Sequence, residues 1–351
     1  MDWENHSTMP DIPDISSYLS QRYNLQNIAI ELLNMVPGKY VYQITLATGV
    51  CWILRMYQVE NDQSAVFSPL ALAYVLAFLE EQQYSAVRIV RSLDGETVVM
   101  HEGWYYLITT FIDGIPFDWS LTAFYNLGAA LGKLHALRLG AAASTLPRAG
   151  MLPSGELAYA QKQLESVESL VPANLQERYE ELLQATALLD RREDLPLVCI
   201  HNDCHPANSI CTAGGQIQLI DWEGAGSGPA VIDVGFLLAS SDDALPWAPL
   251  ASLDTYHLYE ERIAAIIEGY CCYHTLTTIE LERLPDALRF RSLVYGACHF
   301  ASTIAERRQE DPQWWWLRYT AAEEIAMLAK EYFLQAKSTK TIAMRLEDLP
   351  F

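Results

Sequence analysis

The stretch VCIHNDCHPANSICTAGGQIQLIDWEGAGSGPAVID, residues 198–233, places carboxylates, an amide and histidines between short apolar runs. Asp203 and Asn208 are five residues apart with Pro206 between them, so a loop rather than one helical face must present both side chains. Asp221 follows QIQLI, a predicted strand whose end would place the carboxylate in a cleft. Carboxylate and amide oxygens are suitable ligands for Mg²⁺, and a carboxylate can accept the proton of an attacking hydroxyl. The stretch therefore predicts phosphoryl transfer, whose catalysis consists mostly of positioning and charge neutralisation.

The length and composition indicate a globular protein with two packed lobes. The chain has 351 residues, more than one ordinary core accommodates, and 51% of them are hydrophobic. Its formal net charge is −21 and no cluster of Lys or Arg stands out, which argues against a nucleic-acid partner. The acidity favours a cationic or neutral small-molecule partner, although it can also serve solubility alone.

The cysteines and the N-terminus predict a cytoplasmic protein. The chain has 7 cysteines, most of them in apolar runs and none in a CxxC pair, as expected for reduced thiols. The first residues, MDWENHSTMPDIPD, are polar and acidic, unlike a signal peptide. No apolar run approaches the roughly 20 residues that cross a bilayer, so we expect no membrane partner.

The pattern along the chain predicts an α+β fold. A β-rich N-terminal lobe, residues 1–112, is expected to form an antiparallel sheet with one helix that starts at Pro69. Its expected strands are 40–46, 51–58, 87–91, 96–101 and 104–112. Residues 113–351 are expected to form a larger, mainly helical catalytic lobe, with helices at 121–137, 156–170 and 174–189 and almost throughout 233–334.

Two linked motifs resemble the aminoglycoside phosphotransferase and choline kinase group, which has a two-lobed, protein-kinase-like fold. The pattern of that group is H-G-D-x-H-x-x-N, followed by a strand ending in D-[FW]-[EDG] and by another Asp about ten residues on. Asn202 stands at the glycine of this pattern, and the matching residues are His201, Asp203, His205, Asn208, Asp221 and Asp233. Three further segments resemble the group: LGKLH at 131–135, FIDG at 111–114 and EGY at 268–270. The resemblance covers roughly residues 40–270.

The resemblance implies a reaction and a set of roles. The expected reaction transfers the γ-phosphoryl group of ATP or GTP, with Mg²⁺, to a hydroxyl of a small acceptor such as an aminoglycoside or amino alcohol. Asp203 is expected to be the base and Asn208 and Asp221 the magnesium ligands. The expected supporting residues are His201, His205 and Asp233, and the expected nucleotide contacts are Arg55 and the backbone of Thr110, Phe111 and Ile112. Weaker candidates for binding the acceptor are Glu223 and Glu268.

Departures in the N-terminal lobe keep an alternative open. Arg55 stands where such kinases carry a lysine, and arginine keeps the charge without being an equivalent residue. The helix from Pro69 offers no acidic partner before Glu80 and Glu81. A pseudokinase that binds a nucleotide or another ligand without turnover is therefore the alternative. A zinc site that combines the nearby histidines and cysteines fits no standard spacing. The acceptor, the choice between ATP and GTP, and the oligomeric state stay open at this stage.

Overall fold

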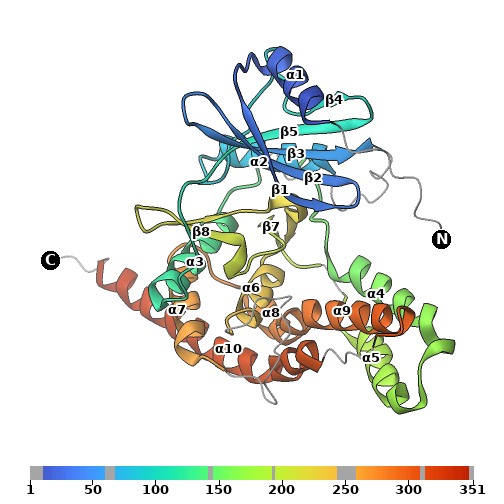
Figure 1. Ribbon diagram of the computed structural model, residues 1–351. Helices are drawn as coiled ribbons and strands as arrows, with labels where there is room; N and C mark the ends of the chain where they lie inside the picture. Colours follow the sequence, from blue (N-terminus) through green and yellow to red (C-terminus); the bar gives the residue numbers. More distant parts are fainter. Residues whose placement is uncertain are drawn as a thin grey trace. The chain divides into compact units, whose positions relative to one another are not determined.

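An antiparallel sheet with strand order β1-β2-β3-β5-β4 forms most of the N-terminal unit, Met1–Ile112, drawn in blue to cyan in Figure 1. The computed structural model describes residues 11–59, 68–140, 145–191, 194–242, 258–308 and 313–347. The strands are β1 (Ala29–Val36), β2 (Lys39–Thr45), β3 (Cys51–Gln58), β4 (Val99–His101) and β5 (Trp104–Thr110). Two helices accompany them, α1 (Ile12–Tyr23) and α2 (Pro69–Glu81).

Alternating apolar side chains give this sheet its core. Tyr42 and Ile44 on β2 and Leu54 and Met56 on β3 are fully buried, as the period of two along a strand requires. They share one hydrophobic cluster with α1, which contributes Leu19 among others. Strands β2, β3 and β5 and helix α2 confirm expected elements of this region, whereas α1 and β1 were not expected.

Part of the N-terminal expectation was wrong. Residues 87–91 form no strand and make only an isolated bridge between Ile89 and Thr109. The strand expected at 96–101 is shorter in the structure, where it is β4 (Val99–His101). The intervening chain is instead a loop held by Arg22 of α1, which pairs with Asp94 at 2.7 Å and with Glu96. Hydrogen bonds between Ser92 and Glu96 within the turn and the ion pairs with Arg22 together hold this loop.

The C-terminal unit, Asp113–Phe351, is mainly helical. Its α-helices are α3 (Leu121–His135), α4 (Pro153–Val167), α5 (Gln176–Leu188), α6 (Ala230–Ala239), α7 (Glu260–Cys271), α8 (Thr278–Glu282), α9 (Leu284–Ala305) and α10 (Gln313–Glu347). Its short strands are β6 (Ile115–Pro116), β7 (Leu197–Ile200), β8 (Ser209–Cys211), β9 (Ile217–Leu219) and β10 (Gly226–Pro229). Within the described ranges, no helix is both long and apolar enough to cross a membrane.

Glycines bring α3 and α7 into backbone contact. A Cβ at Gly128 would lie 2.1 Å from the carbonyl oxygen of Ile266, and one at Gly132 would lie 2.5 Å from that of Tyr270. Neither site has room for a side chain, so the two helices approach more closely than bulkier residues permit. This approach sets the end of α3, with His135, against Tyr270 of α7.

Two small antiparallel sheets support the stretch that opened the sequence analysis. β7 pairs with β10, and β8 pairs with both β6 and β9. The loop of residues 201–208 runs from β7 to β8, and residues 220–225 run from β9 to β10. Both connections therefore start and end on paired strands, which limits how far they can move.

Candidate active site

Asp203 and Asn208 meet within the loop of residues 201–208, which we call the catalytic loop. Nδ2 of Asn208 donates to Oδ2 of Asp203 at 2.7 Å and to the Asp203 carbonyl oxygen at 3.0 Å. A 3₁₀ turn at Pro206–Asn208 closes the loop and turns Asn208 back toward Asp203. Because its amide nitrogen is committed to Asp203, the atom of Asn208 that remains for a cation is the oxygen, Oδ1.

The Asp203 carboxyl is largely withdrawn from water, with 23% of its side chain exposed. Burial raises the pKa of Asp203 above its ordinary value, while the positive charge of Arg291 and the hydrogen bond from Asn208 oppose that rise. A carboxylate with a raised pKa is a better proton acceptor than a solvated aspartate. The environment therefore suits a general base.

Asp221 lies at the open end of the β8–β9 hairpin, next to Asn208. Ser209 pairs with Leu219, and the amide of Ile220 donates to the carbonyl oxygen of Asn208 at 2.9 Å. Asp221 is the next residue and has φ +63°, a left-handed conformation that aspartate tolerates better than most side chains. The hairpin thus places both candidate ligands at one end.

The donor set fits a hard divalent cation. One carboxylate and one amide oxygen leave most positions for water and phosphate oxygens, as Mg²⁺ prefers. Among the described residues, no group of three or more His, Cys, Asp or Glu side chains could hold a metal ion. The zinc alternative therefore finds no cluster around Cys199, Cys204, His201 and His205, all of which are described.

Asp233, on the first turn of α6, holds the beginning of the catalytic loop. Its carboxylate accepts from the amide of His201 at 2.7 Å and from the amide of Asn202 at 2.6 Å. It also contacts Nε2 of His135 at 3.1 Å, and Nδ1 of His135 contacts the Tyr270 hydroxyl at 2.9 Å. Asp233 is only 1% exposed, and these bonds give its buried charge the partners it requires.

The two histidines of the loop are buried and occupy different environments. Nε2 of His201 lies 2.9 Å from the carbonyl oxygen of Ile220, and a carbonyl only accepts, so this nitrogen carries the hydrogen. Nε2 of His205 lies 3.8 Å from Oδ2 of Asp203. Burial lowers the pKa of His205 to about 3, so its ring is neutral and the contact is no ion pair at neutral pH. His201 therefore links the loop to the segment that carries Asp221.

Arg291 on α9 received no role from the sequence. Its Nη2 donates to Oδ1 of Asn202 at 2.9 Å and also to the Asn202 carbonyl oxygen, and the side chain is 1% exposed. A sequence signal for it does exist. Arg291 follows the buried residues Leu284 and Leu288 at helical spacing, so it occupies the apolar face of α9. A cation on such a face requires acceptors elsewhere in the fold.

Arg55 lies on β3 in the N-terminal unit, and its Nη1 donates to the Thr109 hydroxyl at 3.3 Å. The acidic residue at the end of α2, Glu80, forms an ion pair with Arg91 at 3.5 Å. Glu80 therefore already has a cationic partner. The contact of Arg55 with Thr109 is a hydrogen bond to a neutral hydroxyl.

In the segment whose backbone is expected to bind the nucleotide base, the amides of Thr110 and Phe111 already donate to other backbone groups. The amide of Thr110 donates to the carbonyl oxygen of Arg88 at 2.8 Å, and that of Phe111 donates to the carbonyl oxygen of Cys51 at 3.3 Å. For the amide of Ile112, no backbone acceptor is found among the residues that the structure describes. For Thr110 and Phe111, the groups that remain candidates for contacting the nucleotide base are therefore the side chains and the carbonyl groups.

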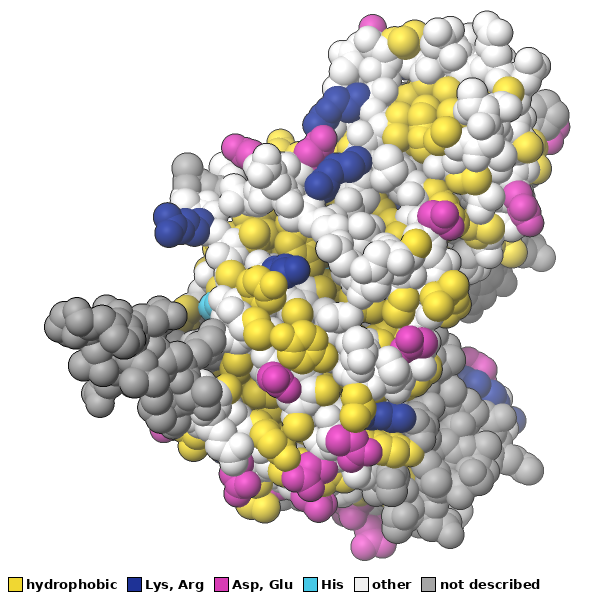
Figure 2. All heavy atoms as spheres, turned by 90° about the vertical axis from the view of Figure 1, so that its left-hand side faces the viewer, with side chains coloured by type: hydrophobic (Ala, Val, Ile, Leu, Met, Phe, Trp, Pro, Cys, Tyr) yellow, Lys and Arg dark blue, Asp and Glu magenta, His cyan; other side chains and the backbone are white. Residues whose placement is uncertain are grey.

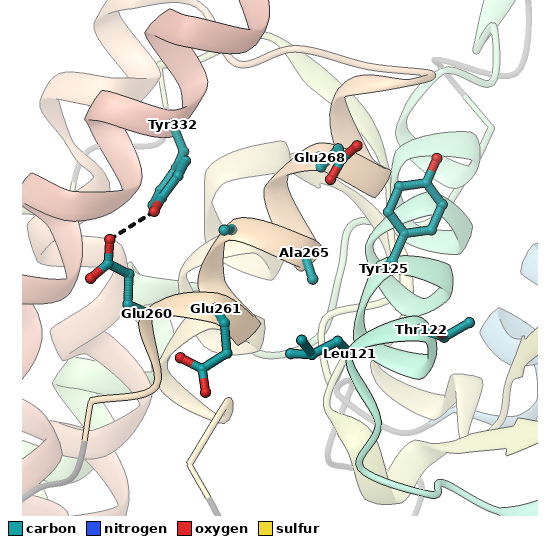
Figure 3. Close-up of a pocket in the computed structure, with 9 residues that line it drawn as sticks. Leu121, Thr122, Tyr125, Glu260, Glu261, Ala265, Glu268 and Tyr332 are labelled. Atoms are coloured by element: carbon teal, nitrogen blue, oxygen red, sulfur yellow. Dashed lines mark hydrogen bonds between the residues drawn. The ribbon is translucent and has the colours of Figure 1, made fainter.

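The two acidic candidates for binding the acceptor lie in different places. Glu223 lies in the short helix η6 (Trp222–Gly224) that follows Asp221. Glu268 lines a pocket of about 600 Å³ on α3, α7 and α10, whose lining includes no residue of the stretch 198–233. Figure 3 shows Glu260 and Tyr332 on one side of this pocket and Tyr125 on the other. The hydroxyl of Tyr332 donates to Oε1 of Glu260 at 2.8 Å. Figure 2 shows several acidic side chains on the lower part of the face that it presents.

Comparisons with known proteins show the family and the fold of this chain. The model of the phosphotransferase enzyme family matches residues 39–271. Stress response kinase A of Escherichia coli strain K12 is 26% identical over 270 residues, covering 69% of this chain and 74% of that protein. An amicoumacin kinase in complex with AMP-PNP, Ca²⁺ and Ami has a TM-score of 0.63 at 19% identity, covering 90% and 93% of the two chains. Spectinomycin phosphotransferase, in complex with ADP and spectinomycin, also scores 0.63 at 12% identity, covering 91% and 98%. These likenesses confirm the expected α+β fold.

Proposed function

Because this chain belongs to the phosphotransferase enzyme family, we propose that it transfers the γ-phosphoryl group of ATP or GTP to a hydroxyl of a small molecule in a magnesium-dependent reaction. The observation that carries the proposal is the 2.7 Å contact between Asp203 and Asn208 in a loop whose amides are held by Asp233. A candidate base and a candidate cation ligand are thereby positioned before any substrate binds. Positioning of this kind supplies most of the catalysis of phosphoryl transfer.

Each residue of the site has a proposed task. Asp203 accepts the proton of the acceptor hydroxyl while the new O–P bond forms and the bond from the γ-phosphorus to the β–γ bridging oxygen breaks, releasing the nucleoside diphosphate. Asn208 Oδ1 and the Asp221 carboxylate hold Mg²⁺, which neutralises phosphate charge when bound. Asp233, with His201, keeps the loop in place. His205, which is neutral, supports Asp203 by packing.

We further propose that Arg55 binds nucleotide phosphate and that the Ile112 amide binds the base. Arg55 stands on β3 where such kinases carry a lysine, and the positive charge and planar fork of donors of a guanidinium suit phosphate oxygens. The backbone of Thr110 and Phe111 contributes its carbonyl groups. These assignments stand separately from the tasks of the catalytic loop.

A cationic acceptor fits the charge of the chain best. The net charge of −21 attracts cations, and three glutamates, Glu260, Glu261 and Glu268, line the pocket on α7. Glu223 lies two residues after Asp221, so its carboxylate is proposed to contact the acceptor near the transferred group. Amino alcohols and aminoglycosides combine hydroxyls with ammonium groups and are the proposed class.

Activity is tested by presenting ATP or GTP, with Mg²⁺, and a panel of amino alcohols, aminoglycosides and neutral sugars. We expect nucleotide affinity to increase with Mg²⁺ and at least one cationic acceptor to be phosphorylated. Asp203→Asn should lower that rate by about 10²–10⁴-fold, the usual contribution of a general base. The matched control is Asp118→Asn, an exposed aspartate that caps the turn before α3 through the Ser120 amide.

Two outcomes would contradict the proposal. Turnover by Asp203→Asn as fast as by Asp118→Asn would show that Asp203 is not the base. Magnesium-dependent nucleotide binding without transfer to any acceptor or to water would favour the pseudokinase alternative. Glu268→Gln should raise the KM of cationic acceptors and leave that of neutral ones unchanged, which tests the acceptor pocket independently.

A further inference from the structure

Asn202 occupies a backbone conformation that explains which residues fit there. Its φ is +64°, in the left-handed region where glycine meets no Cβ penalty and asparagine is among the best tolerated side chains. Asparagine at this glycine position of the family pattern therefore keeps the backbone path. It also adds an amide with an acceptor oxygen and two donor hydrogens.

The Asn202 side chain joins three segments of the C-terminal unit. Its Nδ2 donates to the carbonyl oxygen of Gly224 at 3.2 Å, and Gly224 ends the turn that begins after Asp221. Its Oδ1 accepts from Nη2 of Arg291, which also donates to the Asn202 carbonyl oxygen. The catalytic loop, the turn after Asp221 and α9 therefore meet at a residue that is 1% exposed.

Arg291 lies close to two aromatic rings and donates to the oxygens of Asn202. Its guanidinium carbon lies 5.6 Å from the ring centre of Phe236 and 5.1 Å from that of Phe290, and its Nη2 donates to neutral oxygens. Its Nε is buried and has no hydrogen-bond partner among the residues that the structure describes. Removing Arg291 would leave the two oxygens of Asn202 without this donor. Arg291 thus contributes the placement of Asn202, beside the effect of its positive charge on Asp203.

We propose that Arg291 is a positioning residue of the phosphotransferase site that acts through Asn202. Its hydrogen bonds hold the residue before Asp203, and the bond from Asn202 to Gly224 holds the turn after Asp221. The base and the cation ligand thereby keep a constant separation. This inference rests on the proposed roles of Asp203 and Asp221, because the connection matters for catalysis only if both act there. A displacement of about 1 Å in such a site can lower a rate about 100-fold.

The test compares Arg291→Met, Asn202→Gly and the double variant in the full chain. Methionine removes the donor at similar length, and glycine keeps the backbone conformation while removing both side-chain bonds of Asn202. The matched control is Arg289→Met on the same helix, whose arginine forms a partly exposed ion pair with Glu323 at 3.0 Å. One readout is ADP formation from ATP with Mg²⁺, using water or a panel hit as acceptor. The second readout is AMP-PNP affinity with and without Mg²⁺, alongside thermal unfolding.

We expect kcat to fall about 10–100-fold in Arg291→Met and about 3–10-fold in Asn202→Gly, with the KM for ATP within about twofold of the parent. The gain in AMP-PNP affinity on adding Mg²⁺ should shrink in both, because the turn carrying Asp221 loses its link. The double variant should be no slower than Arg291→Met, since both changes remove one shared connection. Arg289→Met should match the parent. A purely structural residue would lower the unfolding temperature and leave the Mg²⁺-dependent gain intact.

The inference is overturned if folded Arg291→Met has the kcat of the parent and the same increase in AMP-PNP affinity on adding Mg²⁺. It is also overturned if the decrease in kcat of the double variant equals the product of the decreases in the two single variants. Should Arg291→Met not fold, Asn202→Gly decides, because glycine suits the backbone at that position. Should the parent show no turnover, the Mg²⁺-dependent gain decides. Asp203→Asn separates the two levels. An inactive Asp203→Asn beside an unaffected Arg291→Met refutes only the positioning role, whereas a fully active Asp203→Asn refutes the proposed function itself.

Discussion

Asp233→Asn is the substitution that tests most directly how the catalytic loop is held. The change is isosteric, so it creates no cavity and alters only charge and hydrogen bonding. Oδ2 of Asp233 accepts from the His201 amide at 2.7 Å and faces His135 Nε2 at 3.1 Å, and Oδ1 accepts from the Asn202 amide at 2.6 Å. An asparagine side chain has a single acceptor oxygen, so in either orientation its NH₂ group faces at least one N–H donor.

The expected cost follows from these bonds. The better orientation points the NH₂ group at the amide of Asn202, so one hydrogen bond to a charged group is lost and a buried donor is left unpaired. Each effect costs about 1–3 kcal/mol. We therefore expect the C-terminal unit to lose about 3 kcal/mol, which lowers its unfolding temperature by about 6–12 °C for a unit of this size.

Differential scanning calorimetry measures the shift, and Asp118→Asn is again the control, because the side-chain oxygen of asparagine can also accept from the Ser120 amide. Amide hydrogen exchange adds a local readout. The amides of His201 and Asn202 should exchange faster in Asp233→Asn than in the parent, since they lose their charged acceptor. The reasoning is refuted if Asp233→Asn unfolds within about 2 °C of the control and both amides keep their protection.

Three further predictions concern pH, packing and phosphate binding. Burial lowers the pKa of His274 to about 4, so the unfolded chain binds a proton below about pH 6.5 that the folded protein does not. The free energy of unfolding should therefore fall as the pH drops from about 6.5 to 4. His274→Gln should reduce this dependence of the free energy on pH, as measured by urea unfolding, and an unchanged dependence would contradict the prediction. Gly128→Ala should cost at least about 2 kcal/mol, because its Cβ would lie 2.1 Å from the Ile266 carbonyl oxygen. The control is Gly155→Ala in α4, where an added Cβ would have no heavy atom within 4 Å, and it should stabilise the protein by about 0.5–1 kcal/mol. Equal melting temperatures for Gly128→Ala and Gly155→Ala would contradict the close contact of α3 with α7. Arg55→Met should weaken AMP-PNP binding about tenfold and Arg55→Lys about threefold at most; an unaffected Met variant would exclude a phosphate contact.

Periodicity predicted several elements that have one buried face, but α1, which buries Ile15 and Leu19, was not predicted. The strand expected at 51–58 coincides with β3, and the helix expected at 121–137 ends at His135. β1 was not predicted, because almost all of its side chains are exposed and it shows no alternation of apolar and polar residues. The expected strand at 87–91 was wrong for a different reason. Its apolar residues and its neighbouring turn suggested a hairpin, but Arg22, far away in sequence, holds the following loop.

Some features of the candidate site were predicted from the sequence, and others became visible only in the structure. Asp203 and Asn208 were predicted to share a loop because they are five residues apart and Pro206 between them disfavours a helix. In the structure, Nδ2 of Asn208 lies 2.7 Å from Oδ2 of Asp203. Their roles stay predictions until the substitutions are measured. His135 and Tyr270 were noticed only as parts of motifs, and their link to Asp233 became visible through the contact of α3 with α7.

By itself, the sequence determined the local chemistry of residues 198–233: which oxygens stand near one another, which turns connect the strands, and which family the stretch resembles. Only the tertiary structure decided what holds that chemistry in place. Arg291 reaches Asn202 across 89 residues of chain, and Asp233 reaches the loop amides across more than 30. An apolar pattern records that a face is buried, whereas a hydrogen bond depends on which distant group arrives within about 3 Å of it. That distance is set by helix packing, which no single segment encodes.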